Sequence, residues 1–211
     1  MNKKPVVLIG GGGHASVLMD ILLSEKREVI AVVSPNDISG RNIFKGAKIL
    51  HSDDEIFQFS HNDIELVNGI GMVPRSTLRK NITETYLRHG YRFSNVIAKN
   101  ASVASNVLLR EGVQILSGAI VNPGAVIGSH SIINTRAVIE HDCLLGDHCF
   151  IGPGAVLCGQ VKTGESVFVG AGSIIIPSMM LHNNSMVGAG AILVQSLDSG
   201  QVCYPVKSVI K

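Results

Sequence analysis

The sequence of 211 residues has no tryptophan, few aromatic residues (4%) and almost no net charge, since 18 lysines and arginines stand against 16 aspartates and glutamates. A charge of +2 offers no basic surface to nucleic acid or to an anionic membrane, so we expect neither partner. Hydrophobic residues make up 45% of the chain, which is too many for a disordered protein. The sequence therefore predicts a folded protein whose core depends on small and aliphatic side chains.

Long hydrophobic runs and targeting signals are also missing. The apolar run Val6–Ile9 ends in four glycines and is much shorter than the hydrophobic region of a signal peptide. No apolar stretch approaches the roughly 18 to 20 residues that a transmembrane helix needs. The cysteines form no CxxC pair and lie among apolar or small residues, which indicates reduced thiols. We therefore expect a cytoplasmic protein without membrane insertion.

A period of six residues runs through the second half of the sequence. From Ala101 onward nearly every sixth residue is small or slim, and two positions further along each repeat every residue except Thr163 is aliphatic. Neither an α-helix nor an isolated strand maintains such a period. It is typical of a parallel β-helix, in which three hexads close a coil of about 18 residues and inward side chains stack from coil to coil. The repeats continue without insertion to Val194, so any chemistry must lie on the faces or corners of this prism.

The first hundred residues show an α/β pattern. We expect strands at 5–10, 28–33, 65–68 and 92–96, and helices at 16–24, 53–59 and 75–89. These elements predict a small parallel sheet with helices over residues 1–96. The repeat domain follows at 97–196, and a C-terminal tail at 197–211.

A glycine-rich loop separates the first predicted strand from the first predicted helix. Gly10-Gly11-Gly12-Gly13-His14-Ala15 matches the GxGxxA fingerprint, in which the backbone approaches a diphosphate at a helix N-terminus. An NAD site would require an acidic residue at the end of the second strand, where this sequence has Ser34-Pro35. The loop therefore fits a nucleotide-sugar better than NAD, with a purely structural turn as the alternative. His14 either contacts a phosphate or sugar hydroxyl or caps the helix.

A histidine flanked by two carboxylates lies in the middle of the repeats. In Glu140-His141-Asp142 the imidazole can accept a proton at neutral pH, and a carboxylate beside it can orient the ring. Adjacent strand residues point to opposite sides, so one of the two carboxylates contacts the ring, and the sequence leaves open which. Gly159 follows one coil later and is a candidate oxyanion donor through its N–H. A surface histidine without a catalytic role is the alternative.

Together these features resemble the sialic acid O-acetyltransferase and bacillosamine N-acetyltransferase family of hexapeptide-repeat sugar acetyltransferases. The glycine loop with His14, hexads such as Cys149-Phe150-Ile151-Gly152 and the segment Ile139–Cys143 carry the resemblance, which covers nearly the whole chain. It implies a left-handed β-helix, although right-handed crossovers are the rule for parallel strands, and it implies a homotrimer. The implied reaction transfers acetyl from acetyl-CoA to the 4-amino group of a nucleotide-linked 4-amino-4,6-dideoxy sugar, for surface polysaccharide or glycan biosynthesis.

The resemblance also implies roles for individual residues. His141 would be the general base, and Asp142 would raise its basicity. The implied substrate-binding residues are Gly12, Gly13, His14, Gly71 and Asn134. The acetyl-CoA cleft would be lined by Phe150, Ala171 and Ala189, and because Phe150 stands where relatives often have a histidine, one CoA contact is lost or replaced.

Three other functions fit parts of this sequence less well. An O-acetyltransferase for a sialic-acid-like sugar shares the fold, the donor and the base, but a free sugar needs no glycine loop, so we favour N-acetylation. A zinc enzyme would need histidines at positions 146 and 177, where the sequence has Gly146 and Pro177, so no metal is expected. A non-catalytic nucleotide-sugar sensor would need no base, and the Glu140-His141-Asp142 cluster argues against it.

Overall fold

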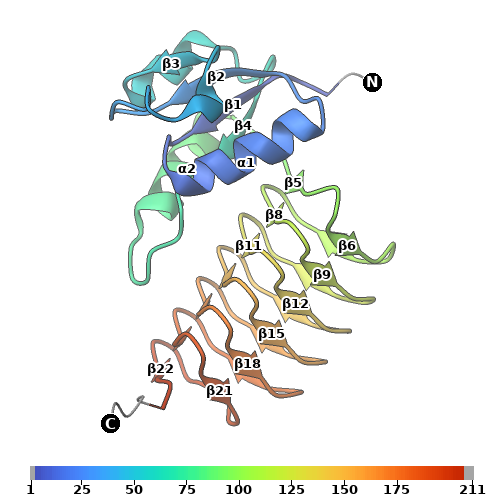
Figure 1. Ribbon diagram of the computed structural model, residues 1–211. Coiled ribbons are helices and arrows are strands. Elements are labelled where there is room, and N and C mark those ends of the chain that lie inside the picture. Colours follow the sequence, from blue (N-terminus) through green and yellow to red (C-terminus); the bar gives the residue numbers. More distant parts are fainter. Residues whose placement is uncertain (1–2, 207–211) are drawn as a thin grey trace. The chain divides into compact units, whose positions relative to one another are not determined.

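The computed structural model describes residues 3–206 and divides the chain into two compact units, Met1–Lys99 and Asn100–Lys211 (Figure 1). The predicted tail begins within the second unit. Its described part contains β22 (Val202–Cys203), which pairs in parallel with β20 (Met186–Val187) of the repeats. Residues 207–211 of that tail lie outside the described residues.

The N-terminal unit contains a four-stranded parallel sheet in the order β3-β2-β1-β4. Its strands are β1 (Val6–Ile9), β2 (Val29–Val33), β3 (Lys48–Leu50) and β4 (Glu65–Asn68). The helices are α1 (Gly13–Ser24), α2 (Leu78–Arg88) and the 3₁₀ helices η1 (Asn42–Phe44) and η2 (Asp53–Gln58). Every residue of β1 is buried, and β1 lies inside the sheet with a strand on each side. The α/β class predicted from the sequence is therefore confirmed.

Two predicted elements differ from the structure. The fourth strand of the sheet is β3, not residues 92–96, of which only Phe93 forms an isolated bridge to Leu66. A strand of three residues shows too little alternation to be recognised in the sequence. A separate short strand, β5 (Val96–Ile97), ends the region predicted as the fourth strand. The predicted helix at 53–59 is the 3₁₀ helix η2.

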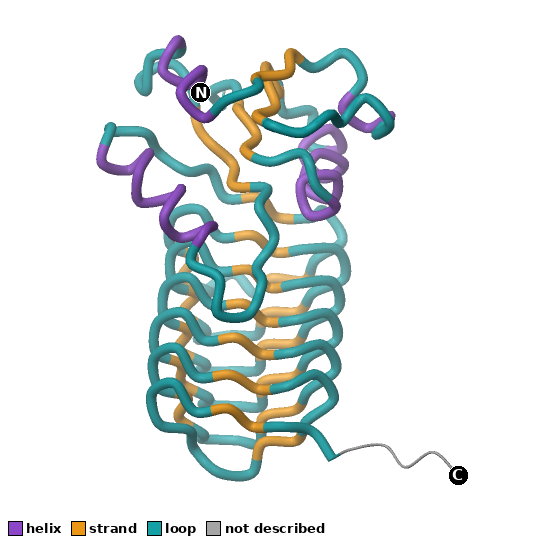
Figure 2. The backbone as a smooth tube through the Cα atoms, turned by 90° about the vertical axis from the view of Figure 1, so that its left-hand side faces the viewer, coloured by secondary structure: helices purple, strands orange, loops and turns teal. Residues whose placement is uncertain are grey.

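The second unit is a left-handed parallel β-helix, as expected, and its coils stack with three columns of two-residue strands (Figure 2). Consecutive strands of a column are one 18-residue coil apart, as in the pairs Val138 with Val156 and Ile132 with Phe150. The exception is β22, since Val202 pairs with Met186 and not with a residue 18 positions earlier. We number the three faces in the order in which the chain visits them. Face 1 consists of β6 (Ser102–Val103), β9 (Ile120–Val121), β12 (Val138–Ile139), β15 (Val156–Leu157), β18 (Ile174–Ile175) and β21 (Ile192–Leu193).

The other two faces follow the same rule. Face 2 consists of β7 (Leu108–Leu109), β10 (Val126–Ile127), β13 (Leu144–Leu145), β16 (Lys162–Thr163) and β19 (Met180–Leu181). Face 3 includes β8 (Gln114–Ile115), β11 (Ile132–Ile133), β14 (Phe150–Ile151), β17 (Phe168–Val169), β20 and β22. In each strand of the central coils the second residue is buried and stacks on its equivalents in the neighbouring coils.

The corners between faces turn sharply because one residue in each adopts the left-handed conformation. At the corner between faces 1 and 2, for example, φ is 78° at Gly124, 60° at Asp142, 63° at Gln160 and 64° at Ser178. The corner between faces 2 and 3 also has stacked glycines. A Cβ at Gly146 would lie 2.4 Å from the carbonyl oxygen of Gly164 in the next coil. The coils can approach this closely only because these positions have no side chain.

We predict that Gly146→Ala destabilises the β-helix by about 1–3 kcal/mol, because the added methyl group overpacks backbone that has little room to shift. Chemical denaturation measures this loss. Ser105→Ala changes an exposed position of the same unit and should shift the free energy of unfolding by less than about 0.5 kcal/mol. Equal stability of Gly146→Ala and the parent would show that the coils are not in close contact at this corner.

Candidate active site

The candidate base lies on the corner between faces 1 and 2. His141 directly precedes Asp142, and its Nδ1 lies 2.9 Å from Asp142 Oδ2. Both side chains are more than half exposed, at 58% and 60%. With Asp142 ionised, the proton of the neutral imidazole belongs on Nδ1, and Nε2 is left as the proton acceptor. The pair therefore presents a basic nitrogen at the surface of the prism.

Two glycines make room for this pair, one from each neighbouring coil. An added Cβ at Gly159 would lie 2.5 Å from His141 Nε2, so the imidazole occupies the space above Gly159. On the other side, a Cβ at Gly124 would lie 2.4 Å from Asp142 Oδ1. Gly159 was predicted as an oxyanion donor, and that role stays a prediction. The contact that the structure shows is the packing of the imidazole against a residue without a side chain.

The structure also answers which carboxylate accompanies the imidazole. Glu140 is occupied elsewhere, since its Oε2 accepts a hydrogen bond of 3.0 Å from Asn122 Nδ2 in the preceding coil. Asp142 has the left-handed φ of the corner, which ends the strand alternation and places its carboxylate beside the ring. Asp142 is therefore the residue that orients His141.

A shallow cavity of about 570 Å³ adjoins Asp142 on the side of face 2. Polar and flexible side chains line it: Asp142, Gln160, Lys162, Ser178, Met179 and Met180. None of these except Asp142 was singled out in the sequence, because Gln160 and Ser178 look there like ordinary turn residues. Lys162 brings a positive charge to the surroundings of the candidate base.

The glycine loop forms the N-terminus of α1 in the other unit. Gly12 is the N-cap, no side chain caps the helix, and the first turn has no acidic residue. Added Cβ atoms at Gly12 and Gly13 would meet nothing within 4 Å, so the helix end is open to a ligand. The first N–H groups of a helix have no partner within the helix and favour negative charge. Arg41 Nη1 adds a cation here by donating to Ser16 Oγ, at 3.3 Å.

His14 and Gly71, two of the predicted substrate-binding residues, lie close together. A Cβ added at Gly71 would lie 3.6 Å from His14 Cβ. Gly71 belongs to the loop that follows β4, and His14 lies in the first turn of α1. Both elements meet where the strands end, which is where open α/β sheets bind ligands.

A cavity of about 470 Å³ opens in the segment between β2 and β3. Its lining includes Asn36, Asp37, Ile38, Phe44, Ile49 and His51. Ile38 also packs on the glycine loop, since a Cβ at Gly11 would lie 2.5 Å from Ile38 Cγ2. The cavity and the glycine loop are therefore neighbours.

Asp37 lines this cavity but was not a candidate in the sequence analysis. An NAD site has its acidic residue at the end of the second strand, and this sequence has Ser34-Pro35 there. The carboxylate of Asp37 accepts hydrogen bonds from Ser39 N, at 2.8 Å, and from Ser39 Oγ, at 3.1 Å. The backbone N–H of Ser39, followed by its hydroxyl, lowers the pKa of Asp37. The sequence feature that could have identified Asp37 is its position two residues after Pro35, just beyond the end of the second strand.

The remaining predicted residues lie away from His141 within the chain. Asn134, Ala171 and Ala189 are at the corner between faces 3 and 1, and Asn134 Oδ1 accepts a 2.7 Å hydrogen bond from Thr135 N. Phe150 is on face 3, stacked on Phe168 with ring centroids 4.8 Å apart. The predicted acetyl-CoA residues therefore lie on face 3 and at its corner with face 1, and not at the corner that holds the base.

Metal-binding clusters and membrane-spanning helices can be assessed only for residues 3–206. No group of three or more His, Cys, Asp or Glu side chains that could hold a metal ion is found there. Among the helices of the same residues, none has the length and hydropathy needed to cross a membrane.

Comparisons with known proteins match both units. Residues 5–86 match the PglD N-terminal domain, and residues 124–159 match the bacterial transferase hexapeptide (six repeats). The structure of PerB from Caulobacter crescentus, in complex with CoA and GDP-perosamine, is 33% identical at a TM-score of 0.85, covering 98% of this chain and 97% of that chain. No curated protein matches the sequence.

Two other solved structures are similar over almost the whole chain. A histidine-to-asparagine mutant of perosamine N-acetyltransferase from Caulobacter crescentus, also in complex with CoA and GDP-perosamine, is 32% identical at a TM-score of 0.86, covering 98% of this chain and 96% of that one. The acetyltransferase domain of PglB from Neisseria gonorrhoeae, in complex with acetyl coenzyme A, is 24% identical at a TM-score of 0.87, covering 99% and 100%. The second of these shows the fold alone.

We predict that Gly159→Ala displaces the imidazole of His141, because the new Cβ would lie 2.5 Å from Nε2. The hydrogen bond to Asp142 should then be lost, and with it the preference for the Nδ1–H tautomer. Long-range ¹H–¹⁵N NMR of the imidazole reports the tautomer directly. Glu140→Gln is the matched control and should leave the signal unchanged, whereas an unchanged signal in Gly159→Ala would contradict the packing described here.

Proposed function

This chain belongs to the family of hexapeptide-repeat sugar N-acetyltransferases, and on that premise we propose which reaction it catalyses. It is an acetyl-CoA-dependent sugar acetyltransferase. The acceptor that we propose is the 4-amino group of a nucleotide-linked 4-amino-4,6-dideoxy sugar, and the GDP-linked sugar of the similar Caulobacter crescentus proteins is the first candidate. The product would serve surface polysaccharide or glycan biosynthesis in the cytoplasm.

The observation that carries this proposal is the His141–Asp142 pair on an exposed corner of the prism. An amine that attacks a thioester must lose a proton, and a general base within reach accelerates such a step by about 10²- to 10⁴-fold. Among the described residues no donor is bonded to His141 Nε2. The imidazole can therefore receive a proton from a bound acceptor.

The reaction can be written with this pair alone as the proton carrier. The amino nitrogen attacks the acetyl carbonyl carbon, a C–N bond forms, and the amine proton moves to His141 Nε2. The tetrahedral intermediate then collapses, the C–S bond breaks, and the imidazolium returns the proton to the CoA thiolate. Asp142 holds Nδ1–H throughout and stabilises the transient positive charge.

A covalent route through cysteine is less favourable. Burial raises the pKa of Cys143 and of Cys149 to about 11, so both thiols are protonated at neutral pH. Direct transfer from acetyl-CoA to the amine needs no thiolate of the protein.

The N-terminal unit would hold the nucleotide. The open N-terminus of α1, with Arg41 beside it, suits the diphosphate, and the cavity between β2 and β3 suits the nucleoside. His14 and Gly71 lie at the same edge and would take part in binding the sugar half.

A homotrimer would bring the donor and the base together. Each side of the coil spans six residues, so adjacent corners can be up to roughly 20 Å apart, whereas reacting atoms must approach to about 3–3.5 Å. The corner with Ala171 and Ala189 and the corner with His141 are different corners of one chain. We propose that a second copy supplies Phe150, Ala171 and Ala189 to the acetyl-CoA cleft.

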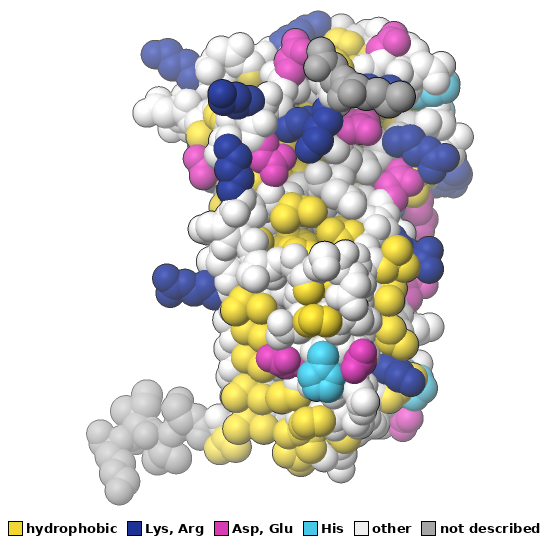
Figure 3. All heavy atoms as spheres, turned by 90° about the vertical axis from the view of Figure 1, so that its right-hand side faces the viewer, with side chains coloured by type: hydrophobic (Ala, Val, Ile, Leu, Met, Phe, Trp, Pro, Cys, Tyr) yellow, Lys and Arg dark blue, Asp and Glu magenta, His cyan; other side chains and the backbone are white. Residues whose placement is uncertain are grey.

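Apolar outer surfaces support association of the prisms. Face 1 exposes Ile120, Ile174 and Ile192, and face 2 exposes Leu108, Leu144 and Met180. In Figure 3 hydrophobic side chains gather in bands along the repeats, with acidic and histidine side chains between them. Bands of this kind on a soluble domain mark an interaction surface.

We expect light scattering to give three times the chain mass of 22.4 kDa at assay concentration. In this proposal the partner brings its donor corner to His141. A monomer with full activity would contradict the shared cleft.

We predict that His141→Ala lowers kcat by about 10²- to 10⁴-fold and leaves KM for both substrates nearly unchanged, because the lost interaction belongs to proton transfer. Steady-state release of CoA measures both constants. The same substitution at the exposed His182 is the control and should alter kcat by less than about twofold. If His141→Ala keeps normal kcat in a correctly assembled protein, positioning alone accounts for catalysis.

A further inference from the structure

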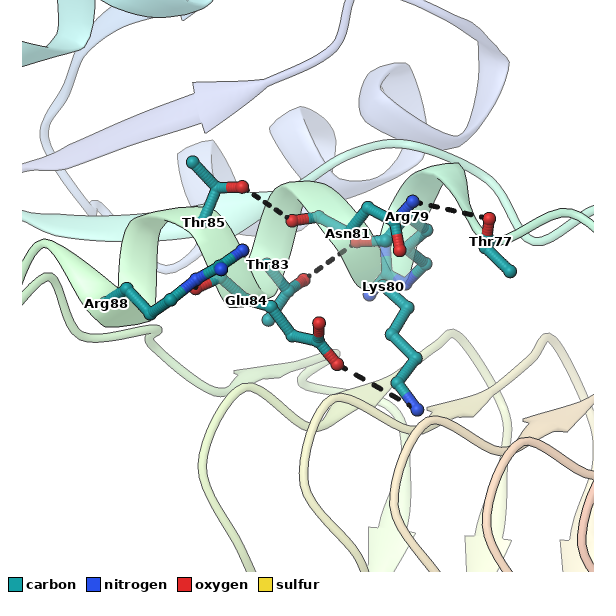
Figure 4. Close-up of polar contacts among 8 residues, drawn as sticks. All are labelled: Thr77, Arg79, Lys80, Asn81, Thr83, Glu84, Thr85 and Arg88. Carbon is teal, nitrogen blue, oxygen red and sulfur yellow. Dashed lines mark hydrogen bonds and ion pairs between the residues drawn. The ribbon is translucent and has the colours of Figure 1, made fainter.

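A buried arginine holds the loop that follows β4. Arg79 lies in the first turn of α2 (Figure 4). The residue is only 3% exposed. Its Nη1 donates to two backbone carbonyls, Asn68 O at 2.7 Å and Ile70 O at 2.6 Å. These two carbonyls stand on either side of Gly69, so one guanidinium nitrogen fixes the course of the whole segment Asn68–Ile70.

The side chain of Asn68 completes the connection in the opposite direction. Its Nδ2 donates to Arg79 O at 3.1 Å and to Thr83 Oγ1 at 2.9 Å, and its Oδ1 accepts from Ile70 N at 3.0 Å. Thr83 Oγ1 in turn donates to Arg79 O, at 3.0 Å, within α2 (Figure 4). The loop is therefore attached to α2 at several points.

The attached segment is in contact with the glycine loop. Gly69 N donates to Ile9 O at 2.7 Å, and a Cβ at Gly69 would lie 2.7 Å from Ala15 Cβ. A Cβ at Gly10 would lie 3.3 Å from both Ile70 N and Ile70 Cγ1. Any displacement of Asn68–Ile70 would therefore disturb the backbone that leads into α1 and the place of Gly71 beside His14.

The charge of Arg79 has no counter-ion among the residues described. Nε and Nη2 are buried and have no hydrogen-bond partner, and no described carboxylate pairs with the guanidinium. Burial alone lowers its pKa to about 9, so the group is still charged at neutral pH. An unpaired buried charge is costly, which makes a purely structural use of arginine here unfavourable.

We propose that Arg79 is a positioning residue for the nucleotide-sugar: it fixes Asn68–Ile70 against the glycine loop, and its unneutralised charge favours an anionic diphosphate at the same edge of the sheet. This inference rests on the function proposed above. The proposed role accounts for an arginine at this position. A neutral donor could satisfy the two carbonyl groups, but only a cation would also attract the phosphates.

The N-terminal unit offers a matched control. Arg27 is also buried, but it lies at the opposite end of the sheet, where Nη2 pairs with Glu65 Oε2 at 3.1 Å and donates to Lys4 O. Its charge is neutralised within the protein. Arg27→Met thus removes a buried arginine of the same unit without touching the proposed binding edge.

The experiment measures binding of GDP and UDP to the full chain by calorimetry, together with steady-state constants. Arg79→Met should weaken binding of the nucleoside diphosphate at least about tenfold and raise KM for the nucleotide-sugar, while KM for acetyl-CoA and kcat change less than about twofold. Arg79→Lys keeps the charge and should show a smaller loss. Added NaCl should weaken binding to the parent more steeply than binding to Arg79→Met.

The control and the conservative variant keep the test decisive. Arg27→Met should bind the nucleoside diphosphates within about twofold of the parent even though its melting temperature falls. If Arg79→Met does not fold, Arg79→Lys decides, because its folding can be checked by circular dichroism. Parent-like binding by the Arg79 variants, or equal weakening in Arg27→Met, would overturn the inference alone. Failure of the parent to bind GDP, UDP or any nucleotide-linked 4-amino sugar would overturn the proposed function itself.

Discussion

Every feature of the candidate active site depends on one constraint, the closure of each coil in 18 residues with corners that turn through a left-handed residue. The interior accepts only side chains that stack, so the inward positions are taken by aliphatic and small residues. Polar side chains are thereby confined to the corners and to the outward positions of the strands. At one corner this places His141 and Asp142 next to each other, with room created by Gly159 below and Gly124 above.

The same constraint separates the parts of the reaction. Residues that follow each other by one coil share a column, whereas residues a third of a coil apart lie on different corners. The proposed base therefore does not share a corner with the proposed donor-binding residues of the same prism. The N-terminal unit works by the opposite principle, since parallel strands bring the glycine loop, the loop after β4 and the segment after β2 to one edge of a sheet. A regular prism suits the proposed proton carrier, and a loop-rich edge suits the proposed binding of the nucleotide.

Much of the fold could be predicted, because the six-residue period follows directly from the stacking of the coils and can be recognised without tertiary information. Which carboxylate contacts the His141 imidazole, that of Glu140 or that of Asp142, could not be predicted. Side chains stop alternating where the strand ends at a corner, and the left-handed φ of Asp142 is a property of the folded coil. The strand Lys48–Leu50 is too short to show a pattern. The role of Arg79 could not be predicted for a different reason. An arginine in the first turn of a polar helix is expected to be solvated, and only the folded structure shows that Arg79 is buried against Asn68 and Ile70.

The most direct test of the account is to identify the product. The purified chain is incubated with acetyl-CoA and, in turn, with GDP-, UDP- and dTDP-linked 4-amino-4,6-dideoxy sugars and with free sialic acid, and the product is examined by NMR while CoA release is recorded. The account predicts that one of the nucleotide-linked sugars acquires an acetamido group at C4, with one CoA released for each amide formed. An acetyl ester on sialic acid, with all the nucleotide-linked amines unchanged, would contradict it and assign the chain to O-acetylation.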